Sequence, residues 1–367
     1  MQDGFLLDRG FQVYLDAYPE AGKLLDLKAL DLQPFEPGAL LFDGKRLRRI
    51  LDPFRRPGHA IESAMQPVGK MMDKLRVGLL KLRASSWTLE KIAQHPEVST
   101  EQWLREFGFS ESMIDTFFRS FYGGIFLESD LRTSSRMFEF TFQMFSQGNA
   151  TLPAHGMQEI PRQLVSRLAP ECLKTHCRVS AISKNAVTLD GMNRMESKHL
   201  VLATDSTAVQ RLFPNALAKK PEWRSVTNLY FSAPRSPIQE KLIALNGKRG
   251  GMVNNVCVLS EIAPAYAPPG QALISVSVLG IHDAIDFPQL IKNELSVWFG
   301  PQAQSWHHLR TDHIHQALPE QAPGSDSFAN PGFRCVDEIF VCGDHLSHPS
   351  IEGAITSGVR TALEILK

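Results

Sequence analysis

The sequence has 367 residues, of which 43% are apolar and 21% are charged, a composition typical of a folded globular protein. This length is too great for one ordinary core, so we expect two closely associated domains. Lys plus Arg equals Asp plus Glu at 39 each, and the resulting net charge of zero excludes a general attraction to nucleic acid or to an anionic membrane.

The first half of the chain is predicted to be mainly helical after an extended start. Residues 3–16 are expected to be extended, and Gly10, between bulky neighbours, indicates a close approach of the backbone to another group. Residues 17–155 are expected to be largely helical, and Met71–Leu82 repeats apolar residues at helical spacing. Ser134–Phe145 is apolar on nearly every side, which predicts a helix that is buried or lines a cavity.

The second half of the chain alternates between helices and strands and then becomes rich in strands. After residue 156 the pattern predicts a helix, two short strands, a parallel-type strand and a second helix, in that order. Strands then dominate residues 224–318, apart from one helix at 288–300. The chain ends with a buried strand at 339–342 and a helix at 353–366.

This order predicts an α/β fold with two interleaved domains. The first is a discontinuous Rossmann-like domain, expected to comprise residues 1–16, 156–215 and 326–367. The second is an α+β domain that contains an antiparallel sheet, expected to comprise residues 17–155 and 216–325.

The C-terminal segment carries the most specific pattern. A buried strand ends in Gly343-Asp344, and after a short loop a helix begins with the four residues Ile351, Glu352, Gly353 and Ala354. Ligands of open α/β sheets bind at the carboxyl ends of strands. Gly343 would let the backbone approach a phosphate or ribityl chain, and Asp344 can accept hydrogen bonds from hydroxyl groups. The helix N-terminus would direct free N–H groups and a positive dipole end at an electron-rich acceptor.

This C-terminal pattern resembles the terminal motif of the flavin-containing amine oxidase, protoporphyrinogen oxidase and phytoene desaturase superfamily. Four further segments resemble that superfamily in chain order: Asp8–Gln12 beside the isoalloxazine ring, the glycine-led helix of Leu152–Leu164, the adenine-contacting strand Val179–Ile182, and the returning strand Leu200–Asp205. The resemblance implies FAD as the cofactor. The cofactor-binding residues that it implies are Gly10, Phe11, Val179, Gly343, Asp344, Ile351, Glu352, Gly353 and Ala354.

One part of the superfamily pattern is missing from the sequence. Such proteins begin with a strand–GxGxxG–helix unit that holds the pyrophosphate, and no GxGxxG occurs in the 367 residues. The likeness starts at about Asp3, so we expect an N-terminal truncation that leaves the Rossmann-like domain without its first βαβ unit. Half of an FAD site would remain, an apolar sheet edge would be exposed, and the chain would not retain FAD through purification.

Three functional hypotheses stay open. The first is an FAD-dependent oxidoreductase that moves a hydride, from a C–H bond next to nitrogen or from a carbon–carbon bond, to flavin N5. The catalytic residues stay unknown, because no acid–base or nucleophile constellation occurs in the sequence and hydride abstraction can proceed without one. The second is a non-catalytic binding protein, because GDP-dissociation-inhibitor and Rab escort proteins resemble this fold. The retained Gly343-Asp344 argues against it. The third is an inactive fragment.

Phenylalanine-rich helical segments bear on the substrate. Most of the rings are expected to be core residues, but so many near Gly123-Gly124 would also suit a tunnel for a large apolar molecule. The rings are Phe117, Phe118, Phe121, Phe138, Phe140, Phe142 and Phe145. We expect a small-molecule, apolar or polyene-like substrate and no nucleic-acid partner.

The remaining polar and sulfur-containing residues give weaker indications. Histidines near Asp312 could be metal ligands, but a polar strand face is favoured and no metal is predicted. The basic run at residues 45–49 is expected to be a solvated edge. Five cysteines without CxxC are expected to be mostly buried thiols in a reducing compartment, and with no secretory signal this predicts a cytoplasmic location. No apolar run reaches the length of a membrane span, and peripheral membrane contact stays open.

Overall fold

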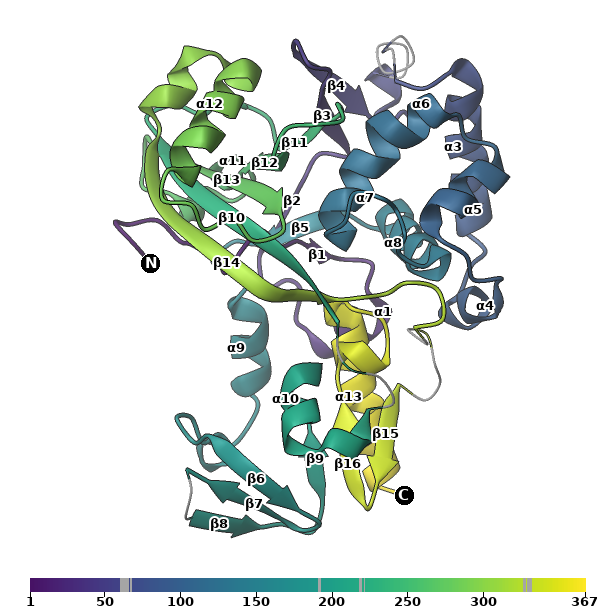
Figure 1. Cartoon of the computed structure of the whole chain (residues 1–367), viewed down its shortest axis with the longest axis vertical. Helices are drawn as coiled ribbons and strands as arrows, with labels where there is room; N and C mark the ends of the chain where they lie inside the picture. Colours follow the sequence, from purple (N-terminus) through teal and green to yellow (C-terminus); the bar gives the residue numbers. More distant parts are fainter. Residues whose placement is uncertain are drawn as a thin grey trace.

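The computed structural model describes residues 1–59, 66, 68–190, 193–217, 220, 222–325, 328 and 332–367. In Figure 1 the upper part of the molecule holds a large sheet on one side and a group of helices on the other. The lower part holds two small sheets together with helices α10 (Ser206–Leu212) and α13 (Ile351–Ile365). The predicted mixed α/β fold with an antiparallel sheet is confirmed.

The large sheet has seven strands in the order β14-β10-β13-β12-β11-β3-β4. All neighbours are antiparallel except β11 and β3. The strands are β3 (Gly38–Phe42), β4 (Leu47–Leu51), β10 (Trp223–Ala233), β11 (Ile243–Asn246), β12 (Val253–Val258), β13 (Ala272–Leu279) and β14 (His307–Pro319). Strands β10, β11, β12, β13 and β14 confirm the prediction that strands dominate residues 224–318.

Both faces of this sheet are covered, because side chains alternate along each strand. Leu229 and Phe231 of β10 pack with Ile291 and Leu295 of α12 (Phe287–Phe299), while Tyr230 between them joins the core on the other face. The core that contains Tyr230 also includes side chains from the helices and from α11 (Leu259–Ile262). The sheet therefore separates two hydrophobic cores.

The expectation that residues 17–155 are largely helical is wrong for residues 32–51. Strands β2 (Leu32–Pro34), β3 and β4 occupy this stretch, and β4 is an edge strand of the large sheet. A short apolar run such as Gly38–Phe42 has no periodicity that separates strand from helix. The basic run lies on this edge: Lys45 and Arg46 are exposed as expected, whereas Arg48 and Arg49 are half-buried and pair with Asp43 and Glu240.

The helical layer contains α3 (Met71–Ala84), α4 (Leu89–Gln94), α5 (Thr100–Phe107), α6 (Glu111–Met113), a π-helical segment (Ile114–Phe118), α7 (Arg119–Phe126) and α8 (Ser135–Gln147). Helix α8 is buried along most of its length, as its all-round apolar pattern predicts. Phe118, Phe138 and Phe140 are fully buried, so the core interpretation holds for these rings. Phe117, Phe121, Phe142 and Phe145 are half-buried and form the rim of the same cluster.

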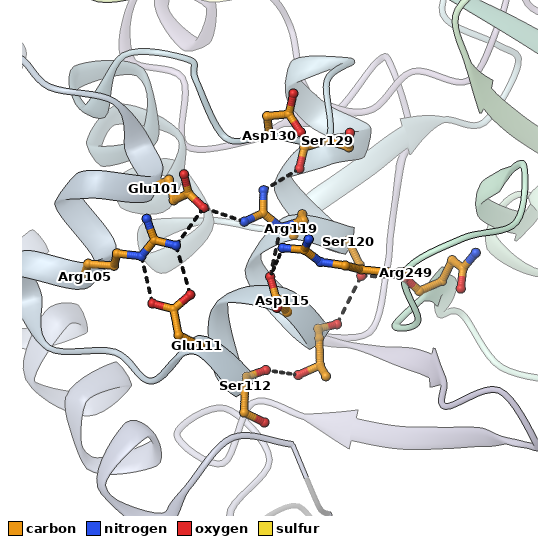
Figure 2. A network of polar contacts seen from close by, with 12 residues as sticks. Glu101, Arg105, Glu111, Ser112, Asp115, Arg119, Ser120, Ser129, Asp130 and Arg249 are labelled. Atoms are coloured by element: carbon orange, nitrogen blue, oxygen red, sulfur yellow. Dashed lines mark hydrogen bonds and ion pairs between the residues drawn. The ribbon is translucent and has the colours of Figure 1, made fainter.

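A polar network ties this helical layer to the sheet (Figure 2). Arg119 donates to Glu101 and Asp115, and Arg249 from the β11–β12 loop donates to the same Asp115. Ser120 donates to the carbonyl of Asn246 at the end of β11. Helices and sheet are therefore joined by directed contacts as well as by apolar packing.

Small elements hold the two ends of the chain together. Strands β1 (Tyr14–Leu15), β5 (Ala150–Pro153) and β2 form one sheet, and α1 (Pro19–Leu24) packs against α13. At the lower end, α9 (Glu159–Val165) leads to the sheet of β6 (Val179–Ser183), β7 (Ala186–Leu189) and β8 (Asn193–Glu196).

The last sheet has the order β15-β16-β9 and contains the predicted buried strand. Strand β16 (Ile339–Cys342) pairs with β15 (Phe333–Val336) and runs parallel to β9 (Leu200–Leu202). Within the described residues β9 is an edge strand, and its Val201 side chain is 37% exposed.

Candidate functional site

The carboxyl ends of β9 and β16 define one side of the candidate site. Gly343 follows β16 with φ of +154°, and its N–H donates to Ser357 Oγ of α13 at 2.8 Å. A Cβ at this position would lie 2.6 Å from the ring of His345, so no larger residue fits without moving that imidazole. The loop after the strand is therefore held closely against α13.

Gly353 in the first turn of α13 is needed for packing of the loop before it. Ser350 caps the helix, and its Oγ accepts the Gly353 N–H at 2.9 Å. A Cβ at Gly353 would lie 1.9 Å from the carbonyl oxygen of His348. Within the described residues, the N–H groups of Ile351 and Glu352 have no acceptor, so they are the helix-end donors left for a ligand.

The Glu352 side chain binds the start of α1. Its two carboxylate oxygens accept the backbone N–H groups of Glu20 and Ala21, each at 2.9 Å. The side chain is fully buried, and this burial raises the pKa of Glu352. Only the Glu352 backbone is therefore available to a cofactor, a restriction that the sequence pattern does not reveal.

Polar atoms without partners are concentrated around the start of α13. Within the described residues, both ring nitrogens of His345, Nε2 of His348 and Oγ1 of Thr356 are buried and form no hydrogen bond. Asp344 is partly exposed, with Oδ1 3.9 Å from His345 Nδ1. Buried polar groups in folded proteins normally have partners, so this concentration fits a site that is completed by a polar ligand.

The predicted segment Asp8–Gln12 is fixed by side chains from the large sheet. Asp8 accepts hydrogen bonds from the backbone N–H of Met157 and from the Tyr266 hydroxyl at 2.7 Å. The Tyr230 hydroxyl is 3.1 Å from the carbonyl oxygens of both Asp8 and Gly10, and Arg310 also donates to the Asp8 carbonyl. Burial raises the pKa of Asp8.

Gly10 and Phe11 lie in this fixed segment. Gly10 has φ of +81°, and a Cβ there would lie 2.5 Å from the Ile314 side chain of β14. Phe11 packs edge-on against Phe35 with ring centroids 6.5 Å apart. Phe11 and Ile351 both pack against the large core between the sheet and the helices.

Val179 lies apart from this group, in β6 of the lower sheet. It lines a cavity of about 370 Å³ together with Arg178, Ser180, Asp190 and Arg211. Neither Gly343 nor Asp344 lines this cavity. Of the predicted site residues, those from Gly343 to Ala354 lie around the start of α13, Gly10 and Phe11 lie in the segment held by the large sheet, and Val179 lies in β6.

The fold agrees with comparisons to known proteins. A family description, "Flavin containing amine oxidoreductase", matches residues 1–366. The chain belongs to this family. A comparison of this sequence with curated proteins found no match.

Several solved structures are similar to this amine oxidoreductase chain. Cyclohexylamine oxidase from Brevibacterium oxydans has a TM-score of 0.66 at 14% identity, over 98% of this chain and 87% of its own. An oxidoreductase from Methanosarcina mazei has a TM-score of 0.59 at 17% identity, over 80% and 73%. The Rab GDI of Plasmodium falciparum has a TM-score of 0.53 at 11% identity, over 98% and 81%. At these identities the likeness shows the fold alone.

The remaining sequence predictions have mixed outcomes. Among the described residues no cluster of potential metal ligands is found, and His308 and His313 contact Thr311 and the His282 carbonyl instead. The expectation of mostly buried thiols is wrong, because three cysteines on short surface segments, Cys172, Cys177 and Cys335, are exposed. No helix in the described part of the chain is long and apolar enough to cross a membrane.

Proposed function

We propose that this chain is an FAD-dependent oxidoreductase that removes a hydride from an apolar small molecule. Bound FAD would supply the hydride acceptor, flavin N5. The observation that carries the proposal is the group of buried, unpartnered polar atoms of His345, His348 and Thr356 at the start of α13, in a chain of the flavin-containing amine oxidoreductase family.

The residues around α13 would bind and orient the flavin end of the cofactor. Asp344 would accept hydrogen bonds from ribityl hydroxyls, and the N–H groups of Ile351 and Glu352 would face the pyrimidine edge, where negative charge increases on reduction. Gly353 and Ala354 have small side chains, so they would let the cofactor approach the same helix end closely. The fixed backbone at Gly10 would lie beside the ring. We also propose that the chain is divided into two interleaved domains with the boundaries expected from the sequence.

The adenine end would involve the backbone of Val179, beside the cavity in the lower sheet. Between the two ends the cofactor has a pyrophosphate, and no GxGxxG loop to hold it exists among the 367 residues. We therefore propose that this polypeptide alone binds FAD weakly.

Half-buried aromatic rings support an apolar substrate. Phe117 and Phe121 stack with centroids 5.7 Å apart, and Phe121 meets Phe145 at 5.3 Å. These rings pack against the core yet keep part of their surface exposed, so they are available to line an apolar binding surface. A cytoplasmic location is also proposed, and it is supported by the unpaired state of the five cysteines.

FAD titration tests the cofactor proposal. The 367-residue polypeptide is expected to show weak or no quenching of FAD fluorescence, and the same polypeptide fused behind a strand–GxGxxG–helix unit should bind tightly. In the fusion, Asp344→Ala should weaken binding by about tenfold or more, the cost of about 1.5–3 kcal/mol for a lost charged hydrogen bond. His199→Ala, at an exposed residue, is the matched control.

Two outcomes of this titration would contradict the proposal. Stoichiometric FAD on the purified 367-residue polypeptide would contradict weak binding, and equal affinities of the fusion and its Asp344→Ala variant would contradict the ribityl assignment. A fusion that binds no FAD would favour the alternative, a non-catalytic binding protein, which the fold similarity to a Rab GDI supports.

A further inference from the structure

Helix α3 carries an exposed apolar stripe that the flavin site does not explain. We define the α3 stripe as five residues with side chains largely in solvent: Met71 (65% exposed), Met72 (54%), Leu75 (66%), Leu79 (57%) and Leu82 (72%). Large exposed apolar patches mark interaction surfaces. Figure 1 shows α3 at the outer, right-hand edge of the helical layer.

The α3 stripe occupies one side of a helix whose opposite side is already buried. At about 100° per residue, its members fall within an arc of about 100°. Asp73, Leu80 and Ala84 face the opposite direction and are fully buried. The helix is therefore attached to the protein by one face and presents a second, separate apolar face to the outside.

Basic side chains flank the stripe on both sides. By the same helical geometry, Lys74 and Lys81 lie along one margin and Arg76 and Arg83 along the other. The only acidic residue in the α3 sequence, Asp73, is buried on the inner face and accepts hydrogen bonds from Ser110. Three of these cations already have partners in the protein: Lys81 pairs with Asp52, Arg76 with Asp73, and Lys74 donates to the Gln66 carbonyl. With four basic residues and one acidic residue, α3 nevertheless carries an excess of positive charge beside its apolar stripe, although the whole chain is neutral.

The apolar surface continues onto the segment before α3. Phe54 is 58% exposed, and its ring lies 2.9 Å from where a Cβ on Gly78 would be. Lys81 Nζ is 5.1 Å from the centre of the same ring and 2.8 Å from Asp52. Phe54, with the cation of Lys81 at its ring, thus extends the apolar stripe.

We propose that α3 docks the protein in the plane of an anionic lipid surface. The stripe and Phe54 would enter the boundary between headgroups and acyl chains. The flanking Lys and Arg side chains would bury their alkyl stems and extend their charges to the lipid phosphates. The excess of basic residues beside the stripe favours this occupant over an apolar protein partner or a second copy of the chain, since those have no requirement for positive charge there. The proposal does not rest on the flavin site.

Vesicle co-sedimentation of the full chain tests the docking without any substitution. Binding to vesicles of phosphatidylcholine with phosphatidylglycerol is expected to exceed binding to pure phosphatidylcholine by about tenfold or more at low salt, and to weaken at high salt. Failure to bind the anionic vesicles would overturn the proposal. Equal binding to both vesicle types would overturn the role of the basic margins.

A matched pair of triple variants tests the stripe itself. Leu75→Gln/Leu79→Gln/Leu82→Gln is expected to lose at least about tenfold in vesicle binding. Ile285→Gln/Val297→Gln/Leu363→Gln, at residues that are 102%, 61% and 60% exposed, should bind like the wild type. Because all six side chains are exposed, both variants should keep the wild-type circular dichroism. Equal vesicle binding by the two variants would overturn the proposal. A different result would also overturn it. If the wild type were a dimer that did not bind vesicles, and the first variant were a monomer, the stripe would be covered by a second copy of the chain.

Discussion

At the residue scale, His348 is a buried neutral histidine. Its ring packs on Phe140 with centroids 4.2 Å apart and on Phe328 at 5.4 Å, and Nδ1 is 2.9 Å from Ser350 Oγ. Burial, with a smaller contribution from the charge of Arg360, lowers the pKa of His348 to about 3. The imidazole therefore stays uncharged in the folded protein at every pH near neutrality.

His348 should make the protein less stable as the pH falls below about 6.5, the usual pKa of an unfolded histidine. Between that value and the folded pKa, the unfolded chain binds a proton that the folded chain does not, so stability is lost on acidification. The loss is at most about 1.4 kcal/mol per pH unit. In urea denaturation at pH 7 and pH 5, His348→Gln should show a shallower pH dependence than the wild type. His199→Gln, at an exposed residue, is the control. Equal slopes for wild type and His348→Gln would contradict this account.

At the element scale, α13 contains two glycines with opposite surroundings. A Cβ at Gly353 would lie 1.9 Å from the His348 carbonyl, whereas a Cβ at Gly358 would have no atom within 4 Å. Both residues lie inside the same helix of 15 residues. Comparing substitutions at the two positions therefore distinguishes the close packing of the loop on Gly353 from the general preference of a helix for alanine over glycine.

Alanine substitutions at these two glycines should therefore change stability in opposite directions. Gly358→Ala should raise the free energy of unfolding by about 0.5–1 kcal/mol, because alanine favours a helix. Gly353→Ala should lower it by about 1–3 kcal/mol, since the loop carbonyl must move. Urea denaturation measures both changes. If Gly353→Ala were as stable as the wild type, the close contact with His348 would not constrain the loop, and closeness to a cofactor would become the better explanation for this glycine.

The same helix shows which features the sequence can predict. A buried strand, Gly343-Asp344 and a helix follow from local composition, and α8 follows from apolar residues on all its sides. The hairpin of β3 and β4 does not, because Gly38–Phe42 is too short to show a period. The Ser350 cap on Gly353 was also not predicted, although a serine three residues before a small helical residue is a recognised capping pattern.

At the scale of the whole molecule, the contacts that assemble the candidate site join residues far apart in sequence. Glu352 holds α1 across 331 residues, and the Tyr230 hydroxyl fixes the Asp8–Gly10 backbone across 220. No local pattern encodes such partners, because the relevant geometry exists only after the sheet and helices have packed. The sequence therefore predicts the elements of the site, while its tyrosines and Arg310 become evident only from the structure.

The network between helices and sheet should contribute measurably to global stability (Figure 2). Arg119 is 10% exposed and donates to Glu101 Oε1, Asp115 Oδ1 and the Ser129 carbonyl at 2.7, 3.1 and 2.7 Å. Arg132 is 62% exposed and pairs with Asp130 only at 3.8 Å. Hydrogen bonds of a charged, nearly buried group contribute far more than an exposed pair, which salt and water screen.

Arg119→Gln should therefore lower the free energy of unfolding by about 1.5–3 kcal/mol, while Arg132→Gln should leave it unchanged within error. Urea denaturation provides the measurement, with the midpoint and slope compared for both variants. Loss of Arg119 leaves Glu101 and Asp115 without a shared cation between α5 and the π-helical segment, and it leaves Arg249 as the partner of Asp115. A double variant with Arg249→Gln should then cost more than the sum of the two single changes, because Asp115 would lose both arginines. Strict additivity would show that the two arginines act independently and that the network does not couple the helices to the sheet.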